Sequence, residues 1–445
     1  MSTRKYFGTD GVRGEVGVSP VTPAEVLHLG WAAGRVLGAG HARGRVIIGK
    51  DTRISGYLLE SALEAGLSAA GVDIALTGPL PTPGIAYLTR QVGACGGIVI
   101  SASHNPYHDN GIKFFSASGR KLDDETEEQI EALMTESMHT VAPEALGKAE
   151  RLVDAVPRYA EHCRNTLPPG LRLDGLKVAL DCAHGASYQV GPLVLRELGA
   201  NVSCVGIEPD GFNINRDGGS TRPDTLCELV RKSGSDIGIA FDGDADRVIL
   251  ADANGGLVNG DGILFLLSRH YHSRENFGGV VGTLMTNLGV ERACRSQGIP
   301  FVRAKVGDRY VLEALAERNW TLGGETSGHI LCLDRSTTGD GLVAALAVMV
   351  TSGRSLAELV SDLEMFPQRL VNVRLEGASP TAVIESQAVI LALRESEAEL
   401  GTRGRVVLRP SGTEPLVRVM VEADNQNCAD QHAERLAAAV SAARA

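Results

Sequence analysis

The sequence predicts an α/β protein with three related α/β domains, each with a mostly parallel, buried sheet, and a smaller C-terminal α+β domain around a central cleft. An apolar run, a polar loop, a helical stretch, a glycine and a second apolar run follow one another three times along the chain, an order typical of a βαβ unit. Past residue 366 the pattern changes to short strands that alternate with helices. The length of 445 residues is enough for about three domains of ordinary size.

The first copy of this repeat begins with the apolar run and polar loop of residues 46–53. A helical stretch then ends at the glycine of residues 67–71, and a strand-like run follows at 72–76. The second copy comprises residues 177–185, 195–199 and 202–205, and the third, looser copy comprises 280–284, 294–298 and 301–302. One large sheet with similar crossovers is the alternative that this pattern leaves open.

The remaining segments separate and complete these units. Residues 123–138 are charged and amphipathic, which predicts a surface helix. In the C-terminal part, strands are predicted at 370–375, 405–408 and 416–421, with an alanine-rich helix after them. The predicted domains are residues 1–155, 156–253, 254–368 and 369–445.

Composition and charge exclude several classes of protein. A net charge of −11 argues against a basic nucleic-acid-binding face, although local arginine-rich loops can still hold a small anion. The longest apolar run, residues 342–350, is far shorter than the roughly 20 residues that cross a bilayer. Eight cysteines without a C-x-x-C pair indicate reduced, mostly buried thiols. With no signal-peptide pattern at the N-terminus, we expect a cytoplasmic protein that binds neither nucleic acid nor membranes.

A serine-containing turn follows the apolar run at residues 98–100. Ser101 and Ser103 lie just past this run, where a hydroxyl can stand free of the strand. An ordinary turn is the simpler interpretation, since Asn-Pro ends it. His104 is adjacent to Ser103, so the two side chains are expected to diverge, and no G-x-S-x-G elbow occurs. A serine hydrolase is therefore disfavoured, and Lys113 on the next strand lies within plausible reach of the serine.

Three alternating aspartates follow a second apolar run, residues 237–241. Asp242, Asp244 and Asp246 offer hard oxygen ligands that suit Mg²⁺, although an isolated turn of this kind is often only a solvated acidic loop. An EF-hand is excluded, because Arg247 occupies the sixth position where a glycine is needed. A serine that carries a phosphoryl group and a cation that neutralises it together suggest phosphoryl transfer through a phosphoserine.

Two further loops contain groups that bind sugars and phosphates. In residues 323–329, Glu325 and Ser327 could hydrogen-bond to sugar hydroxyls, unless this segment is only a turn between strands. No P-loop or dinucleotide-binding motif occurs. The second loop, near the C-terminus, offers a cradle for a phosphate dianion, formed by Arg409, Ser411, Gly412, Thr413 and Arg418. Together with the serine turn and the aspartate loop this makes four loops, one in each predicted domain, which predict a cleft lined from all sides.

These motifs resemble those of the α-D-phosphohexomutase superfamily, from Tyr6 to the C-terminus. The phosphoserine loop matches residues 101–106, the metal loop 242–247, the sugar loop 324–329 and the phosphate loop 409–415. Residues 6–14 and 307–311 are similar to the bacterial phosphoglucosamine mutase branch. Thr326 departs from the glutamine expected in this branch and from the methionine of phosphomannomutases and phosphoglucomutases.

The resemblance implies four domains around the cleft and the interconversion of glucosamine 6-phosphate and glucosamine 1-phosphate. It also implies one Mg²⁺, a glucosamine 1,6-bisphosphate or other hexose bisphosphate as intermediate or activator, and a homodimer as one option. The alternatives are a phosphomannomutase or phosphoglucomutase and, more distantly, a Mg²⁺-dependent sugar phosphatase. The implied residues are Ser103, Lys113, Arg13, His104 and His329 for catalysis, Ser103, Asp242, Asp244 and Asp246 for the metal, and Glu325, Ser327, Arg247, Arg409, Ser411, Gly412, Thr413 and Arg418 for the substrate.

Overall fold

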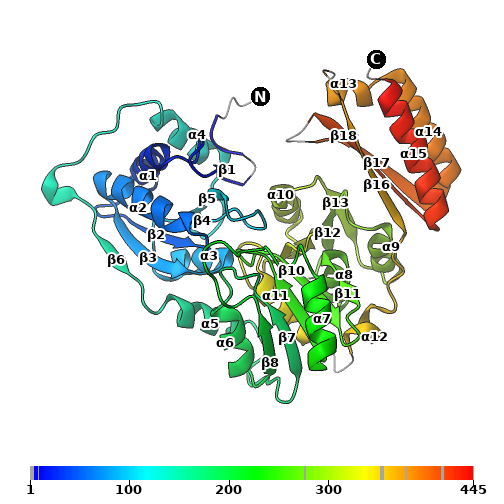
Figure 1. The fold of residues 1–445 in the computed structure, drawn as a ribbon, viewed down its shortest axis with the longest axis horizontal. Coiled ribbons are helices and arrows are strands. Elements are labelled where there is room, and N and C mark those ends of the chain that lie inside the picture. Colours follow the sequence, from blue (N-terminus) through cyan, green and yellow to red (C-terminus); the bar gives the residue numbers. More distant parts are fainter. Residues whose placement is uncertain are drawn as a thin grey trace.

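Four separate sheets follow one another in chain order, each with its own helices (Figure 1). The computed structural model describes residues 5–8, 10–274, 277–350, 355–375, 377, 379–411 and 415–443. The first sheet lies at the left of Figure 1 and the last, with the C-terminus, at the upper right, while the second and third lie below and between them.

The first unit contains a six-stranded mixed sheet. Its central strands β2, β3 and β4 run parallel, and β5 runs antiparallel to β4 and to β1. Helices α1 and α2 approach closely because both are glycine-containing: a Cβ on Gly66 would lie 2.1 Å from the carbonyl oxygen of Leu27. In sheet order the strands are β1 (Val12–Glu15), β5 (Asp109–Ser116), β4 (Gly96–Ile100), β2 (Arg45–Lys50), β3 (Asp73–Pro79) and β6 (Ala149–Arg151). The helices are α1 (Pro23–Leu37), α2 (Ser55–Ala69), α3 (Thr82–Gln91) and α4 (Asp124–Leu133).

The second and third units repeat this plan with fewer strands. In each, the parallel core is extended by antiparallel strands at one edge. The second sheet has the order β11 (Leu257–Val258), β10 (Val248–Asp252), β9 (Ile237–Phe241), β7 (Lys177–Asp181) and β8 (Asn201–Val205). The third has the order β13 (Phe301–Ala304), β12 (Val280–Thr283), β14 (Leu322–Gly324) and β15 (Ile330–Cys332). Their helices are α5 (Ala155–Asn165), α6 (Val190–Glu197), α7 (Asp224–Ser233), α8 (Gly260–His272), α9 (Leu288–Ser296), α10 (Asp308–Arg318), α11 (Gly341–Met349) and α12 (Leu356–Val360).

The C-terminal unit is an antiparallel three-stranded sheet with helices packed on it. Figure 1 shows its two long helices side by side along the sheet. Its apolar core is separate from the others and includes Val389, Val419 and Leu436. The strands are β16 (Gln368–Arg374), β18 (Leu416–Ala423) and β17 (Gly404–Pro410), and the helices are α13 (Pro380–Ile384), α14 (Gln387–Leu400) and α15 (Gln426–Ala442).

The predicted fold class is confirmed: three α/β units with mostly parallel sheets precede a smaller α+β unit. The single-sheet alternative is wrong, because the three βαβ copies lie in three different sheets. The predicted surface helix at 123–138 is shorter than expected and ends at Leu133. The domain boundaries stay a prediction; β11 pairs with β10 in the second sheet, although the predicted third domain begins at residue 254.

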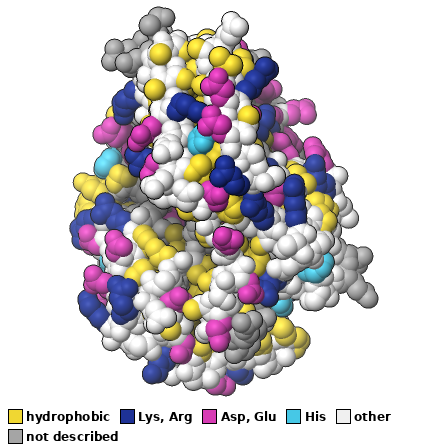
Figure 2. Space-filling view, turned by 90° about the vertical axis from the view of Figure 1, so that its right-hand side faces the viewer, with side chains coloured by type: hydrophobic (Ala, Val, Ile, Leu, Met, Phe, Trp, Pro, Cys, Tyr) yellow, Lys and Arg dark blue, Asp and Glu magenta, His cyan; other side chains and the backbone are white. Residues whose placement is uncertain are grey.

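The surface and the cysteines agree with a protein of mixed charge and reduced thiols. On the face shown in Figure 2, lysine and arginine side chains lie among aspartates and glutamates. All eight cysteines are free thiols, as predicted, and most are buried. Among the described residues, no helix is both long and apolar enough to cross a membrane.

Candidate active site

Ser103 sits in a tight turn directly after β4. It is buried and has a φ of 51°, a left-handed conformation that a serine adopts only where its surroundings hold it. Its N–H donates to Ser101 Oγ at 2.9 Å, and that hydroxyl donates to Asp51 Oδ2 at 2.6 Å. Ser103 Oγ donates to Asp242 Oδ2 at 2.5 Å. The turn therefore aims the Ser103 hydroxyl at the aspartate loop of the second unit.

Arg53 is the residue that holds this turn in shape. Its guanidinium is fully buried and donates from Nη2 to the carbonyl oxygens of Ser103 and Asn105, both at 2.9 Å. Nη1 donates to the carbonyl oxygens of Asp109, at 3.1 Å, and of Pro106. An ion pair of 2.8 Å with Asp51 completes its partners. The sequence did not single out Arg53, which is a basic residue in the polar loop after the apolar run that begins at residue 46.

Replacing Arg53 with leucine should lower the free energy of unfolding by about 3–5 kcal/mol, because Asp51 would be left as a buried, unpaired charge. Several carbonyls of the serine turn would also lose their donor. Urea unfolding measures the change. Arg43→Leu is the control, since Arg43 pairs with Asp73 on the surface and its loss should have little effect. Equal losses in the two variants would contradict the scaffold role of Arg53.

Asp242, Asp244 and Asp246 lie together in the loop after β9. All three are buried, and one carboxylate oxygen from each lies within 4.8 Å of the others. Ala245, at a φ of 56°, turns the chain so that the alternating aspartates face the same point. Burial, and then the charges of Asp246 and Asp244, raise the pKa of Asp242 well above its usual value. This concentration of negative charge is costly unless a cation balances it.

The aspartate loop fits a hard divalent cation. Oδ1 of Asp244 and Oδ1 of Asp246 are buried and have no hydrogen-bond partner within the described part of the chain. Ser103 Oγ adds a further oxygen beside Asp242. Oxygen ligands of this kind, with no sulfur or imidazole among them, are preferred by Mg²⁺ over softer metals.

Basic side chains surround the aspartates. Lys113 Nζ lies 2.8 Å from Asp244 Oδ2, 3.2 Å from Asp246 Oδ2 and 3.3 Å from Asp10 Oδ2. Burial lowers the pKa of Lys113, but the charges of Asp10 and Asp244 outweigh it and hold the pKa well above its usual value. Arg13 pairs with Asp10 at the edge of this network. Lys113 is therefore a buried, charged ammonium group within the cluster.

The two histidines of the site differ in charge. Burial lowers the pKa of His329, but the carboxylates of Asp246 and Asp308, each 3.6 Å from a ring nitrogen, outweigh it and raise the pKa to about 9. Burial and then the charge of Arg247 lower the pKa of His104 to about 4. At neutral pH His329 is an imidazolium and His104 a neutral imidazole.

The expectation that Ser103 and His104 diverge is wrong. His104 Nδ1 lies 3.2 Å from Ser103 Oγ. The left-handed conformation of Ser103 turns the chain so sharply that two adjacent side chains meet. Sequence spacing alone does not reveal this geometry, because it assumes ordinary backbone angles.

The sugar loop, residues 324–329, lies between β14 and β15. Glu325 Oε1 accepts a hydrogen bond of 2.9 Å from the N–H of Gly307, just before α10. Ser327 is exposed at the tip of the loop. Arg247 of the aspartate loop forms an isolated backbone bridge with His329, which joins the second unit to the third. Hydrogen bonds therefore hold the loop at Glu325 and at His329, while Ser327 between them is exposed to solvent.

The phosphate loop of the C-terminal unit presents two arginines next to each other. Arg409 on β17 lies directly opposite Arg418 on β18. Nε of both side chains, and Ser411 Oγ, are buried without a hydrogen-bond partner among the described residues. Burial, and then the charge of Arg418, lower the pKa of Arg409. Two adjacent guanidinium groups suit a dianion such as phosphate. Gly412 and Thr413 lie outside the described residues.

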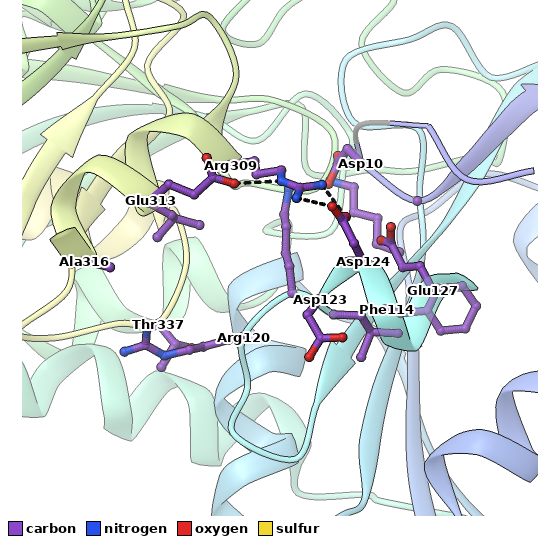
Figure 3. Close-up of a pocket in the computed structure, with 15 residues that line it drawn as sticks. Asp10, Phe114, Arg120, Asp123, Asp124, Glu127, Arg309, Glu313, Ala316 and Thr337 are labelled. Carbon is purple, nitrogen blue, oxygen red and sulfur yellow. Dashed lines mark hydrogen bonds and ion pairs between the residues drawn. The ribbon is translucent and has the colours of Figure 1, made fainter. Parts of the chain in front are cut away.

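A cavity of about 350 Å³ extends from the charged cluster between the first and third units (Figure 3). Asp10 and Lys113 line it together with the apolar side chains of Phe114 and Ala316. Figure 3 shows Arg309 of α10 reaching across to Asp124 of α4, with two hydrogen bonds of 2.5 and 2.6 Å. This pair bridges the two units beside the cluster.

The structure thus brings most of the predicted site residues into one place. Ser103 contacts His104 and Asp242, Lys113 contacts Asp244 and Asp246, and the three carboxylates join these contacts into one cluster. The charge of Glu325 acts to raise the pKa of both Arg247 and Arg409. Such a set can hold a metal ion, bind an anion and move a proton. The role of each residue stays a prediction.

Comparisons with known proteins agree with this geometry. Two relatives called phosphoglucosamine mutase, from Ralstonia pickettii and Chromohalobacter salexigens, are 57% and 58% identical to this chain. The first alignment covers 98% of this chain and 99% of the relative, the second 98% of each. Models of the phosphoglucomutase/phosphomannomutase family match at residues 4–140 (domain I), 157–256 (domain II), 259–366 (domain III) and 370–439 (C-terminal domain).

Solved structures show the same fold at low identity. A phosphoglucomutase/phosphomannomutase family protein from Burkholderia thailandensis has a TM-score of 0.81 at 23% identity, covering 98% of this chain and 96% of that protein. An N-acetylphosphoglucosamine mutase from Aspergillus fumigatus has a TM-score of 0.67 at 18% identity, covering 99% and 96%. Four family domains in order and near-full-length relatives lead to one conclusion. The chain belongs to the phosphoglucomutase/phosphomannomutase family of the α-D-phosphohexomutase superfamily, and within it to the bacterial phosphoglucosamine mutases.

Proposed function

We propose that this isomerase interconverts glucosamine 6-phosphate and glucosamine 1-phosphate through a phosphoserine and a glucosamine 1,6-bisphosphate. The observation that carries the proposal is the placement of Ser103 Oγ, 2.5 Å from Asp242 in a buried carboxylate cluster that Lys113 also enters. The relatives at 57% and 58% identity, named phosphoglucosamine mutases, support the choice of sugar. The product would feed the synthesis of UDP-N-acetylglucosamine and the cell wall in the cytoplasm.

Asp242, Asp244, Asp246 and the oxygen on Ser103 would hold one Mg²⁺ ion. When bound, this ion neutralises negative charge on the phosphoryl group during transfer. Lys113 brings a second positive charge to the same carboxylates. Its raised pKa keeps it charged at neutral pH. The cluster therefore stabilises a phosphoryl group that is bonded neither to the serine nor to the sugar.

The transfer begins with a phosphorylated Ser103. The bond from Ser103 Oγ to phosphorus breaks, and a bond forms from a sugar hydroxyl to phosphorus, which gives the bisphosphate. The proton of the sugar hydroxyl ends on the departing Ser103 Oγ, and neutral His104, 3.2 Å from that oxygen, can relay it. In the second transfer, Ser103 receives the other phosphate of the reoriented bisphosphate. His329 and Arg13 carry positive charge near this path.

The other two loops would bind the part of the substrate that does not react. Glu325 and Ser327 would hold sugar hydroxyls, and Arg247 lies next to them across the backbone bridge to His329. Arg409, Ser411 and Arg418 would hold the second phosphate, because their unpartnered donors suit an anion. Gly412 and Thr413 belong to the same proposed cradle.

Arg409→Ala should raise KM for the sugar monophosphate about tenfold to hundredfold, because a charge-assisted hydrogen bond to phosphate is lost. The bisphosphate should also escape into solution during turnover, and its release can be measured directly. Arg369→Ala is the control on the same sheet, since Arg369 pairs with Asp430 outside the loop. An unchanged KM without extra release would show that the phosphate loop does not bind substrate.

A coupled assay that compares glucosamine 6-phosphate with glucose and mannose phosphates tests the choice of substrate. We expect the amino sugar to be converted with the highest kcat/KM. Preference for a neutral sugar would favour a phosphomannomutase or phosphoglucomutase, the nearest alternative. Release of inorganic phosphate in place of isomerisation would favour a phosphatase. A homodimer and a hexose bisphosphate activator stay predictions.

A further inference from the structure

The coupling loop, residues 284–288, comprises the segment after β12 and the first residue of α9, and it contacts the C-terminal unit. Arg405 of β17 donates from Nη1 to the carbonyl oxygen of Leu284 at 2.8 Å and from Nη2 to that of Thr286 at 2.7 Å. The N–H of Leu288 donates to Glu422 of β18 at 3.0 Å. Arg405 and Glu422 also pair with each other at 2.5 Å. The side chain of Glu422 is fully buried, so this contact is part of the interface between the two units.

Asn287 in the coupling loop also holds the connection to the C-terminal unit. Its Nδ2 donates to the carbonyl oxygen of Phe366 at 3.0 Å, and its Oδ1 accepts from the N–H of Phe366 at 2.9 Å. Phe366 lies two residues before β16. Oδ1 also accepts from the N–H of Gly289 at the start of α9. A displacement of Phe366, in the segment that leads to the C-terminal unit, would therefore also displace the coupling loop.

The coupling loop reaches the sugar loop through Asp261. The N–H of Asn287 donates to Asp261 Oδ2 at 2.9 Å, and the hydroxyl of Thr326 donates to Asp261 Oδ1 at 2.9 Å. Asp261 is buried near the start of α8, and a Cβ on Gly260 would lie 2.0 Å from the carbonyl oxygen of Glu325. Helix α8 therefore rests directly against the sugar loop, and Asp261 is one hydrogen-bonded link between them. The N–H of Gly260 also donates to the carbonyl oxygen of Thr326 at 3.1 Å, and the Thr326 hydroxyl lies 3.3 Å from the carbonyl oxygen of Met285 in the coupling loop.

We infer that Asp261 is a positioning residue, which sets the sugar loop through Thr326 according to how the C-terminal unit sits on the coupling loop. The inference rests on the proposed function. It gives a role to Thr326, where the resemblance leads one to expect glutamine. The phosphate loop and the sugar loop belong to different units, and this hydrogen-bonded path connects those units.

The charge state of Asp261 agrees with this role. Burial raises the pKa of Asp261 to about 6, although the hydrogen bonds from Asn287 and Thr326 favour the charged form. At neutral pH the carboxylate is ionised and accepts from both donors. Losing either donor would leave a buried carboxylate oxygen unsatisfied, which is costly.

Thr326→Val tests the link, because it removes the hydroxyl and keeps the shape of the side chain. KM for glucosamine 6-phosphate should rise about tenfold with a smaller change in kcat, since a hydrogen bond to a charged group is lost. Thr326→Ser should restore the wild-type KM. Ser268→Ala is the matched control, because it removes a buried hydroxyl of α8 whose partners among the described residues are the carbonyl oxygen of Phe265 and the thiol of Cys294. An unchanged KM in Thr326→Val would overturn the proposal.

A double-mutant cycle tests the connection to the C-terminal unit. If Arg405 and Thr326 act along one path, the double variant Arg405→Met, Thr326→Val should raise KM by less than the product of the two single effects. Effects that simply multiply would contradict the coupling. Hydrogen exchange of the Asn287 amide needs no substrate, and should be faster in Thr326→Val than in Ser268→Ala. If the protein does not isomerise glucosamine 6-phosphate, the proposed function fails, while this exchange difference still decides whether the link exists.

Discussion

Ser103→Ala is expected to lose mutase turnover by several orders of magnitude while it stays folded. Without the hydroxyl the chain has no group at this position that can carry the phosphoryl group between two sites of the sugar. The turn itself should persist, since Arg53 and Asn215 hold its carbonyl groups and not its side chain. Turnover is measured in the coupled assay and the fold by circular dichroism and urea unfolding.

Intact-mass analysis gives the second half of this test. A fraction of the wild-type protein should be one phosphoryl group heavier, and peptide mapping should place that group on Ser103. Ser187→Ala is a suitable control, because Ser187 is buried near the aspartate loop without a role in the proposed reaction. Full activity of Ser103→Ala, or phosphate found only on Ser101, would show that the nucleophile has been misassigned.

The serine turn and the aspartate loop could be predicted from the sequence, because each follows a buried strand. An apolar β-branched run fixes where a strand ends, and in parallel sheets the loops after the strands meet at one edge. That reasoning placed Ser103 and the three aspartates correctly at strand ends. It did not predict the contact of Ser103 with His104, which depends on a left-handed backbone. Nor did it find Arg53, whose carbonyl partners come from a turn that lies about 50 residues further along the chain.

Removal of the divalent cation should abolish turnover, and Mg²⁺ should restore it. Asp244→Asn should lower both metal affinity and the transfer rate by orders of magnitude, because it removes one of three charges that hold the cation. It also removes the shortest ion pair between Lys113 and the three aspartates, at 2.8 Å. Calorimetric titration with Mg²⁺ and the coupled assay measure the two effects separately.

Asp181→Asn is the matched control for this prediction. Asp181 is also a buried carboxylate at the end of a strand in the same sheet, but it accepts from the N–H groups of Ala183 and Gly219 and is outside the cluster. Its substitution should affect stability more than metal affinity. Normal turnover of chelator-treated protein would mean that the aspartate loop serves another purpose.

Contacts between residues far apart in the chain, or on different elements, could not be read from the sequence. The contacts of Asn287 with Phe366, of Asp261 with Thr326 and of Arg409 with Arg418 join residues from separate elements whose spacing carries no periodic signal. The sequence identified Thr326 only as a departure from the expected pattern. The structure supplies a physical reason for a hydroxyl at this position, because it satisfies a buried carboxylate.

The most direct test of the central claim follows the phosphoryl group itself. Protein phosphorylated on Ser103 is mixed with one equivalent of glucosamine 6-phosphate in the presence of Mg²⁺, and the reaction is stopped at successive times for mass analysis of the protein and the sugar. The account predicts that the phosphoryl group leaves Ser103 and appears at position 1 of the sugar in the 1,6-bisphosphate. The other phosphate, from position 6, then phosphorylates Ser103 again as glucosamine 1-phosphate forms. Release of the group as inorganic phosphate, or its retention on Ser103 while the product forms, would contradict the account.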